Sequence, residues 1–365
     1  MGDKIRVAVI GCGGMGRHHV EVVQGMDGFE VAALCDVSAE ALEKIGDQHQ
    51  IPARYEDCEK MFDEVSPDIA AVATQTRGHC GPVVAALRRG ISVLCEKPIA
   101  IDLAEADQMV EAGRASGARL AINQQNHLNP GIRKARELVA QGLIGEVVLV
   151  RGRNKAGRKS GNEFMEMGTH VTDMMLRFGS MPQWCAGTVY AQGRLAGPQD
   201  IMEAKEMSPR DRDSGLVMGE RALAHYGFAG GVLGEIHFID YPKTMGANYG
   251  VDLLGTEGQL AVRASGHVGQ NLWYLPRPME GQPADLGDWQ AMDLSDMGAE
   301  SPIALMYRGL AEAAAGVEPP GSGEEGRWAF EMIMAIYQSH REGGRRVELP
   351  LADRRHPLET WRAQG

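Results

Sequence analysis

The sequence lacks the features that mark membrane, nucleic-acid-binding and disulfide-bonded proteins. No apolar run approaches the roughly 20 residues that a membrane-spanning helix needs. With 37 Lys and Arg against 49 Asp and Glu, the net charge is −12, which argues against a surface for nucleic acid or anionic membranes. The six cysteines are scattered, without C-x-x-C or a paired histidine-rich spacing, so we expect neither a disulfide framework nor a metal site.

The first residues also lack a targeting signal. The segment from Met1 leads into a charged strand without the long apolar core of a secretory signal. Arg6 stands where a myristoylation signal would have Ser or Thr. Together with reduced cysteines, these absences predict a cytoplasmic protein. At 365 residues the chain is long enough for two domains.

A glycine-rich turn follows the first predicted strand. The β-branched run 6–10 leads into Gly11-Cys12-Gly13-Gly14-Met15-Gly16, and a helical stretch continues to residue 24. This is G-x-G-x-x-G: Gly11 permits the turn, Gly13 lets a pyrophosphate approach the backbone, and Gly16 lets helix and strand pack closely. The phosphates would lie at the start of the helix, beside Gly14 and Met15, where free N–H groups favour negative charge. The motif predicts a dinucleotide site.

An acidic residue ends the second predicted strand. Asp36 lies 20 residues after Gly16, where a carboxylate accepts hydrogen bonds from the adenosine ribose hydroxyls and repels a 2′-phosphate. No arginine stands beside it, so NAD is favoured over NADP. A glycine turn followed by a helix-capping Asp is the alternative. The matched order of strand, turn, helix and acid favours the cofactor site.

Strands continue to alternate with helices as far as residue 123, which predicts a doubly wound parallel sheet. Thr74, Gln75, Thr76 and His79 follow the fourth strand, on the cofactor side, although His79 also suits a capping or packing role. Glu96-Lys97-Pro98 follows the apolar segment 90–94. Ligands in such sheets bind outside the carboxyl ends of the strands, so Glu96 and Lys97 are candidate site residues. A solvated turn is the alternative interpretation of this pair.

The pattern changes after residue 123. Segments 221–228 and 232–241 flank Ala229-Gly230-Gly231, and segments 249–254 and 259–263 flank a second glycine-containing turn, so we expect two hairpins. Helices are predicted at 131–141, 303–315 and 324–341. The sequence therefore predicts a Rossmann domain over residues 1–123 and an α+β domain with a large, mostly antiparallel open-faced sheet over residues 124–365.

A histidine flanked by two acids stands in the second domain. If the segment 166–173 is helical, Glu166, His170 and Asp173 lie at i, i+4 and i+7 on one face. A histidine held by carboxylates suits a general base, because its unperturbed pKa of about 6.5 is near neutrality. The alternative is an ordinary polar residue on a helix.

The glycine motif, Asp36, the segment 74–79 and Glu96-Lys97-Pro98, at these spacings, resemble the Gfo/Idh/MocA family of sugar and inositol oxidoreductases. The family has Thr-Pro-Asn-x-x-His after the fourth strand, whereas this chain has Gln75 and Thr76. It has Asp-x-x-x-His-x-x-Asp where this chain begins with Glu166. The resemblance covers nearly the whole chain and weakens between 193 and 214.

The resemblance implies roles for these residues. Lys97 would contact the substrate hydroxyl beside the nicotinamide and stabilise negative charge on its oxygen, and His170 would accept its proton. Glu166 and Asp173 would orient His170 or bind neighbouring hydroxyls. The family also implies a homodimer or homotetramer built through the outer face of the second sheet.

Two further segments are candidates for substrate binding. Segment 124–130, with Asn126 and His127 as the candidates within it, stands where many relatives carry an arginine–aromatic pair, and amides there suit neutral hydroxyls, which implies a changed substrate. Segment 151–159 carries five basic residues, and Arg153, Asn154 and Arg158 are the candidates within it. They would bind a carboxylate or phosphate, although a solvated or interface loop is the usual role of such a run.

These features predict an NAD-dependent dehydrogenase of a sugar, polyol or sugar derivative. Two alternatives remain open at this point. Relatives that hold NAD permanently use transient oxidation to cleave glycosides or to eliminate, and Glu166 in place of Asp keeps this alternative in view. A sensor that binds dinucleotide without turnover is the other, although the presence of Lys97, His170 and Asp173 argues against it.

Overall fold

The computed structural model describes residues 4–154, 164–204, 213–239, 249–264, 271–277, 287–313 and 318–363. The chain forms two compact units, one of residues 1–125, 210–215 and 300–327 and the other of residues 126–209, 216–299 and 328–365. Within the described ranges, no helix is both long and apolar enough to cross a bilayer.

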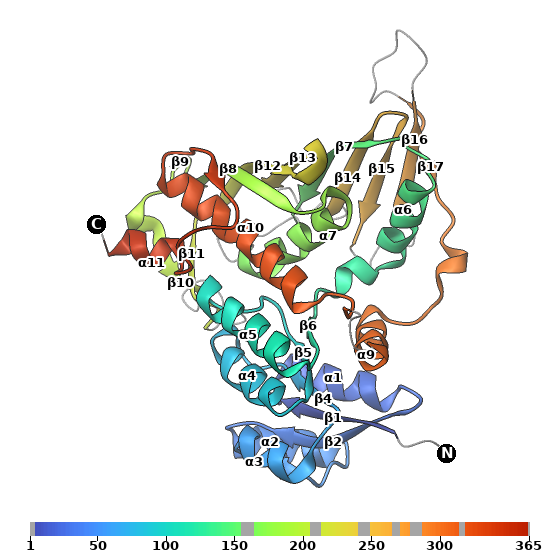
Figure 1. Cartoon of the computed structure of the whole chain (residues 1–365), viewed down its shortest axis with the longest axis vertical. Helices are drawn as coiled ribbons and strands as arrows, with labels where there is room; N and C mark the ends of the chain where they lie inside the picture. The colour runs from blue at the N-terminus through green and yellow to red at the C-terminus, as the bar shows by residue number, and fades with distance from the viewer. Residues whose placement is uncertain are drawn as a thin grey trace. The chain divides into compact units, whose positions relative to one another are not determined.

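The first unit contains a six-stranded parallel sheet in the order β3-β2-β1-β4-β5-β6. Its strands are β1 (Ile5–Ile10), β2 (Phe29–Cys35), β3 (Arg54–Tyr55), β4 (Ile69–Val72), β5 (Ser92–Cys95) and β6 (Leu120–Ile122). The connecting helices are α1 (Gly14–Gln24), α2 (Ala39–Gln48), α3 (Cys58–Val65), α4 (Cys80–Arg88) and α5 (Leu103–Ser116) (Figure 1). Because the sheet grows in both directions from β1 through right-handed crossovers, helices cover both faces. The predicted Rossmann sheet is confirmed.

Local sequence signals explain these elements. β4 is buried along its whole length, as expected for a central parallel strand covered on both faces. Asp102 caps α5 by accepting a hydrogen bond from the backbone N–H of Glu105. Gly117 then ends α5 in the left-handed region, at φ 76°.

Helix α9 (Pro302–Glu312) belongs to the first unit, although it is separated from the parallel sheet by about half the sequence. It contacts α1 and β5, and Ile303, Met306, Tyr307 and Leu310 form its buried side. The sequence assigned everything after residue 123 to the second domain, and that boundary stays a prediction. An apolar helical stripe does not specify which sheet it covers, so the placement of α9 had no local signal.

The second unit contains a ten-stranded sheet with the order β17-β16-β15-β14-β7-β13-β12-β8-β18, and β9 pairs with β8. Its strands are β7 (Val147–Arg153), β8 (Pro182–Ala191), β9 (Arg194–Leu195), β12 (Arg221–Phe228), β13 (Leu233–Phe238), β14 (Gly250–Gly255), β15 (Gly258–Arg263), β16 (Leu272–Pro276), β17 (Gln290–Ala291) and β18 (Val347–Glu348). The β7–β13 pair is parallel and the others are antiparallel. Both predicted hairpins, β12–β13 and β14–β15, are confirmed.

Helices α6 (Pro130–Ala140), α7 (Thr169–Gly179) and α10 (Gly323–Arg341) lie along one face of this sheet (Figure 1). Two short strands, β10 (Ile201–Glu203) and β11 (Leu216–Met218), pair with each other, and α11 (Pro357–Arg362) contacts β11. Buried and more exposed residues alternate along β12 and β13, so the opposite face of the sheet is open.

Candidate functional site

The glycines of the first turn divide into two that pack and two that face open space. Gly11 has φ +96°, and a Cβ there would lie 2.7 Å from the Ala73 backbone. A Cβ on Gly16 would lie 1.7 Å from the carbonyl oxygen of Gly11, so only glycine permits this contact of helix and strand. A Cβ on Gly13 or Gly14 would meet nothing within 4 Å. The turn is therefore closely packed at Gly11 and Gly16 and open at Gly13 and Gly14, where a pyrophosphate would approach.

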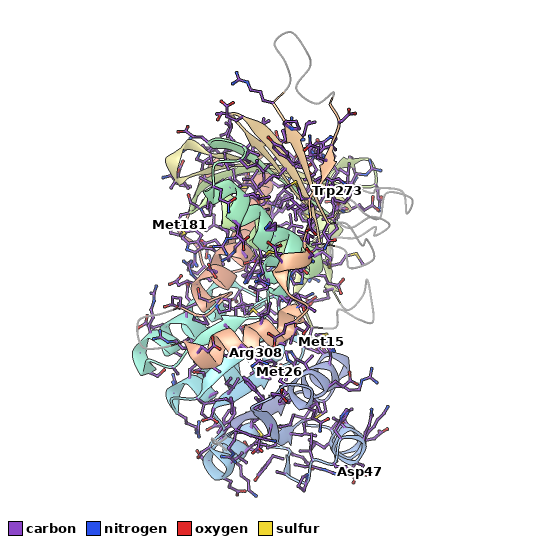
Figure 2. All side chains as sticks on the ribbon, turned by 90° about the vertical axis from the view of Figure 1, so that its right-hand side faces the viewer. Met15, Met26, Asp47, Met181, Trp273 and Arg308 are labelled. Carbon is purple, nitrogen blue, oxygen red and sulfur yellow. The ribbon has the colours of Figure 1, made fainter. Side chains whose placement is uncertain are left out.

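Helix α1 begins at this open side. Its N-cap is Gly13, no side chain caps its first N–H groups, and its first turn carries no acidic residue. Such a terminus favours an anion. Met15, in the first turn, keeps 39 % of its surface exposed (Figure 2). These features fit the phosphate groups of a dinucleotide.

Asp36 is fixed by two backbone N–H groups at the end of β2. Cys12 donates to its Oδ2 at 2.6 Å, and Ser38 donates to its Oδ1 at 2.8 Å. The carboxylate is thereby tied to the glycine turn and remains half-buried. Burial, together with the charge of Asp36, raises the pKa of the Cys12 thiol to about 12, so this thiol stays neutral. The position of Asp36 fits the ribose-binding role that the sequence predicted.

The segment after β4 places its residues in different environments. Thr74 is half-buried, Gln75 is exposed, and Thr76 is buried at the start of the short helix η1 (Thr76–Gly78). His79 is buried, with Nδ1 3.1 Å from the Pro98 carbonyl oxygen and Nε2 3.1 Å from that of Thr74. Burial lowers the pKa of His79. His79 thus connects the segments after β4 and β5, and its direct contact with a cofactor stays a prediction.

Glu96 and Lys97 follow β5, next to the ends of β4 and β6 in the same sheet. Lys97 is half-buried, and its backbone N–H donates to Glu96 Oε2 at 3.3 Å. Glu96 is buried, and its Oε1 accepts from Asn123 Nδ2 at 2.6 Å and from His19 Nε2 at 3.0 Å. Burial alone would raise the pKa of Glu96, but the hydrogen bond and charge of His19, the Asn123 hydrogen bond and the charge of Lys97 lower it to about 2. Glu96 is therefore a buried carboxylate at neutral pH.

Sequence reasoning missed three of the groups around Glu96. His19 lies on the buried side of α1, and its Nδ1 is 2.8 Å from the hydroxyl of Tyr307 in α9. Asn123 ends the alternating region of the sequence and was treated only as a boundary. The sequence signal for His19 is its position three residues after Gly16, which places it on the sheet-facing side of the helix. No sequence signal points to Tyr307.

In the second unit, the predicted Glu166–His170–Asp173 segment is helical but not uniformly α-helical. Residues Phe164–Gly168 form a π-helical turn, η3, and α7 starts at Thr169. His170 is buried in the first turn of α7, whereas Glu166 is half-buried in the π turn. The simple i, i+4 spacing on one α-helical face is thus altered between Glu166 and His170. Such π segments occur frequently at functional sites.

Asp173 is buried and binds two cationic or potentially cationic groups. Its Oδ2 lies 2.8 Å from His127 Nδ1, and its Oδ1 accepts from an Arg177 guanidinium nitrogen at 2.7 Å. Burial alone would raise the pKa of Asp173, but the Arg177 charge and the His127 contact lower it. The sequence predicted that Asp173 orients His170. The structure shows Asp173 in contact with His127, which the sequence predicted as a substrate-binding residue. The His127–Asp173 contact brings two predicted site residues together.

The remaining predicted substrate residues have structural contacts of their own. Asn126 Nδ2 donates to the Tyr249 hydroxyl at 2.7 Å. Arg153 pairs with Asp252 at 2.5 Å on the open face of the sheet. Asn154 exchanges hydrogen bonds with the backbone of Ile239 and so extends the pairing of β7 and β13. Arg158 lies outside the described residues. Substrate contact by any of these four stays a prediction.

Comparisons with known proteins agree with this architecture. Residues 5–124 match the model of the Gfo/Idh/MocA oxidoreductase family, described as having an NAD-binding Rossmann fold. D-apiose dehydrogenase of Paraburkholderia graminis is 26 % identical over 99 % of this chain and 94 % of its own length. Myo-inositol 2-dehydrogenase of Thermotoga maritima is 23 % identical over 93 % of this chain and 97 % of its own.

A solved structure has the same fold over almost the whole chain. Levoglucosan dehydrogenase, determined with NADH and levoglucosan, superposes with a TM-score of 0.75 at 16 % identity and covers 96 % of this chain and 100 % of its own. This likeness concerns the fold. The resemblance based on the sequence motifs is thus confirmed: residues 5–124 match the NAD-binding Rossmann domain of the Gfo/Idh/MocA oxidoreductase family, and two dehydrogenases are similar to the chain over more than nine-tenths of its length.

Proposed function

We propose that this protein is an NAD-dependent dehydrogenase that oxidises a hydroxyl group of a sugar, polyol or sugar derivative. The observation that carries the proposal is the open glycine turn with Asp36 fixed beside it. Dehydrogenases named for apiose and myo-inositol are similar to the chain over more than nine-tenths of its length. NAD, when bound, supplies the hydride acceptor, and the protein supplies binding, orientation and proton transfer.

The test is NADH formation by the purified protein, supplied with NAD and a panel of neutral sugars, polyols and sugar acids. NADH produced from one class supports the proposal and identifies the substrate class. If protein that already contains NAD consumes a sugar and releases no free NADH, the closed redox cycle replaces the proposed dehydrogenase. NAD binding without conversion of any substrate would replace it with a sensor.

We propose that Lys97 and His170 perform the proton and charge chemistry on the substrate hydroxyl. His170 accepts the hydroxyl proton, and the Lys97 ammonium stabilises the negative charge that develops on the oxygen. The location of Lys97 after β5 and the burial of His170 at the start of α7 support these roles. Glu166 and Asp173 would orient the polar groups around His170.

His127 is proposed as a substrate-binding residue whose orientation is fixed by Asp173. A neutral imidazole that donates from Nδ1 to the Asp173 carboxylate has an unprotonated Nε2, which can only accept. This Nε2 is buried and has no hydrogen-bond partner among the described residues. Because a buried polar atom without a partner costs about 1–3 kcal/mol, a ligand that satisfies it gains that difference. A sugar hydroxyl is a suitable donor to this atom.

Asp36→Ser is expected to reduce the preference for NAD. Serine keeps a polar side chain but removes the charge that repels a 2′-phosphate and the acceptors for the ribose hydroxyls. We expect KM for NAD to rise about tenfold or more and the NAD/NADP ratio of kcat/KM to fall by a larger factor, as measured from initial rates with each cofactor.

Asp47→Ser is the matched control for Asp36→Ser. Asp47 lies on α2 of the same unit with its side chain 76 % exposed (Figure 2). We expect this variant to keep the wild-type cofactor ratio. An Asp36→Ser variant with the same ratio as Asp47→Ser would exclude Asp36 from cofactor selection.

We propose that the protein is a cytoplasmic homodimer or homotetramer assembled through the open face of the ten-stranded sheet. Leu223, Leu233 and Leu254 are 42 %, 49 % and 36 % exposed on this face. Arg151 pairs with Glu235 at 2.8 Å on the same face. Apolar side chains beside paired charges suit a permanent protein interface.

Leu233→Arg is expected to weaken this assembly at least tenfold, because it places an unpaired charge inside the buried interface. Analytical ultracentrifugation of both proteins over a range of concentrations measures the change. Wild-type protein that sediments only as a monomer at the highest concentration would contradict the proposed assembly.

A further inference from the structure

Three buried side chains from distant parts of the sequence form a hydrogen-bonded chain that ends beside Lys97. Tyr307 in α9 contacts Nδ1 of His19 in α1 at 2.8 Å, and Nε2 of His19 contacts Glu96 Oε1 at 3.0 Å. Tyr307 and His19 are fully buried and Glu96 is 6 % exposed. Since bulk water does not reach these atoms, each contact needs a defined donor and a defined acceptor.

The protons in this chain can be assigned from its two ends. Glu96 is ionised at neutral pH, because its pKa is about 2, so it only accepts, and His19 Nε2 must carry a proton. Burial raises the pKa of Tyr307 well above 10, so its hydroxyl keeps its proton. Among the described residues, the acceptor within hydrogen-bond distance of this hydroxyl is His19 Nδ1. His19 therefore donates from Nε2 to Glu96, and its Nδ1 is the partner of the Tyr307 hydroxyl.

Two donors hold the same oxygen of Glu96: His19 Nε2 at 3.0 Å and Asn123 Nδ2 at 2.6 Å. The charge of Lys97 is among the causes that lower the pKa of Glu96. A buried carboxylate that is held in place in this way stabilises the charged form of the neighbouring Lys97.

We propose that Tyr307 and His19 are positioning residues for Lys97: they hold Glu96 as a buried carboxylate beside Lys97, which keeps Lys97 protonated and fixes the segment after β5. This inference rests on the proposed role of Lys97. It assigns a part in the reaction to α9, a helix that lies outside the matched NAD-binding segment. The protonation and position of Lys97 then depend on residues of its own unit.

The direct test is the ¹⁵N NMR spectrum of histidine-labelled protein, with the His19 signals identified by their loss in His19→Gln. We expect a proton on Nε2 at pH 7 and a change in the Nδ1 signal in Tyr307→Phe. A ring without a proton on Nε2 at pH 7 would overturn the proposal. This measurement requires no turnover, so it stands apart from any failure of the proposed dehydrogenase activity.

The second test is the pH dependence of kcat. Glu96→Gln removes the charge and is expected to move the alkaline limb about one pH unit towards acid, because Lys97 then loses its proton more easily. His19→Gln, an uncharged side chain that can donate to Glu96 and accept from Tyr307, is expected to leave that limb in place. Tyr307→Phe is expected to lower kcat about tenfold with little change in NADH affinity.

Tyr337→Phe is the control for loss of a buried tyrosine hydroxyl, because Tyr337 is fully buried in α10 of the other unit. It is expected to keep the wild-type kcat and pH profile. If Glu96→Gln binds NADH normally and keeps the wild-type alkaline limb, Glu96 does not tune Lys97 and the proposal is wrong. If Tyr307→Phe lowers kcat no more than Tyr337→Phe does, α9 has no part in the reaction.

Discussion

Lys97→Met is expected to lower kcat by about 10²–10³-fold while leaving the affinity for NADH nearly unchanged. As the hydride leaves carbon, the hydroxyl oxygen acquires negative charge, and a fixed ammonium stabilises that charge more than it stabilises the ground state. Methionine has a similar length and keeps the apolar stem of the side chain, but it has neither the charge nor the donor. Steady-state kinetics for kcat and NADH fluorescence titration for affinity separate the two quantities.

Lys44→Met is the matched control for Lys97→Met. Lys44 is exposed on α2 of the same unit, and we expect its replacement to leave kcat at the wild-type value. The assignment of Lys97 fails if its variant keeps more than half of the wild-type kcat. It also fails if the loss lies only in NADH affinity, because Lys97 would then be a cofactor ligand without a role in the chemical step.

His170→Asn is expected to lower kcat by about 10²–10⁴-fold, the usual range for removal of a general base. Asparagine keeps polarity and approximate size but cannot accept and hold a proton. The pH profile provides a second readout. A general base must be unprotonated to act, so wild-type kcat should fall on the acid side of the profile, and the variant should lose that dependence. Initial rates with saturating NAD and substrate measure both effects.

His127→Asn makes the same substitution at the other buried histidine proposed for the site. If His127 binds substrate through Nε2, the variant should raise the substrate KM about tenfold with a smaller change in kcat, since a hydrogen bond made in both ground and transition states is lost. A His127→Asn variant with the larger kcat loss and a flattened pH profile would transfer the base role from His170 to His127. The pair of variants thus decides which imidazole takes the proton.

The nucleotide-binding unit could be predicted in detail from the sequence because its signals are local. Gly11 and Gly16 occupy positions where a Cβ would overlap the backbone, so the turn itself selects those residues. Asp36 follows its strand at the spacing that a ribose contact needs, and Asp102 caps the helix that it precedes. The alternation of strands with helices predicted the parallel sheet, and the strand periodicity predicted both hairpins of the second sheet.

The groups that tune the candidate site depended on tertiary structure. Tyr307 reaches His19 across 288 positions, and His127 reaches Asp173 across 46. Periodicity identifies a buried helical face but does not name its partner, because many apolar faces of similar width are equivalent until the chain is folded. The π turn that separates Glu166 from His170 likewise follows from packing, since no local pattern distinguishes it from an α-helix. Thus the sequence by itself determined the fold, the cofactor and the candidate residues, and only the tertiary structure decided which buried partner each of them has.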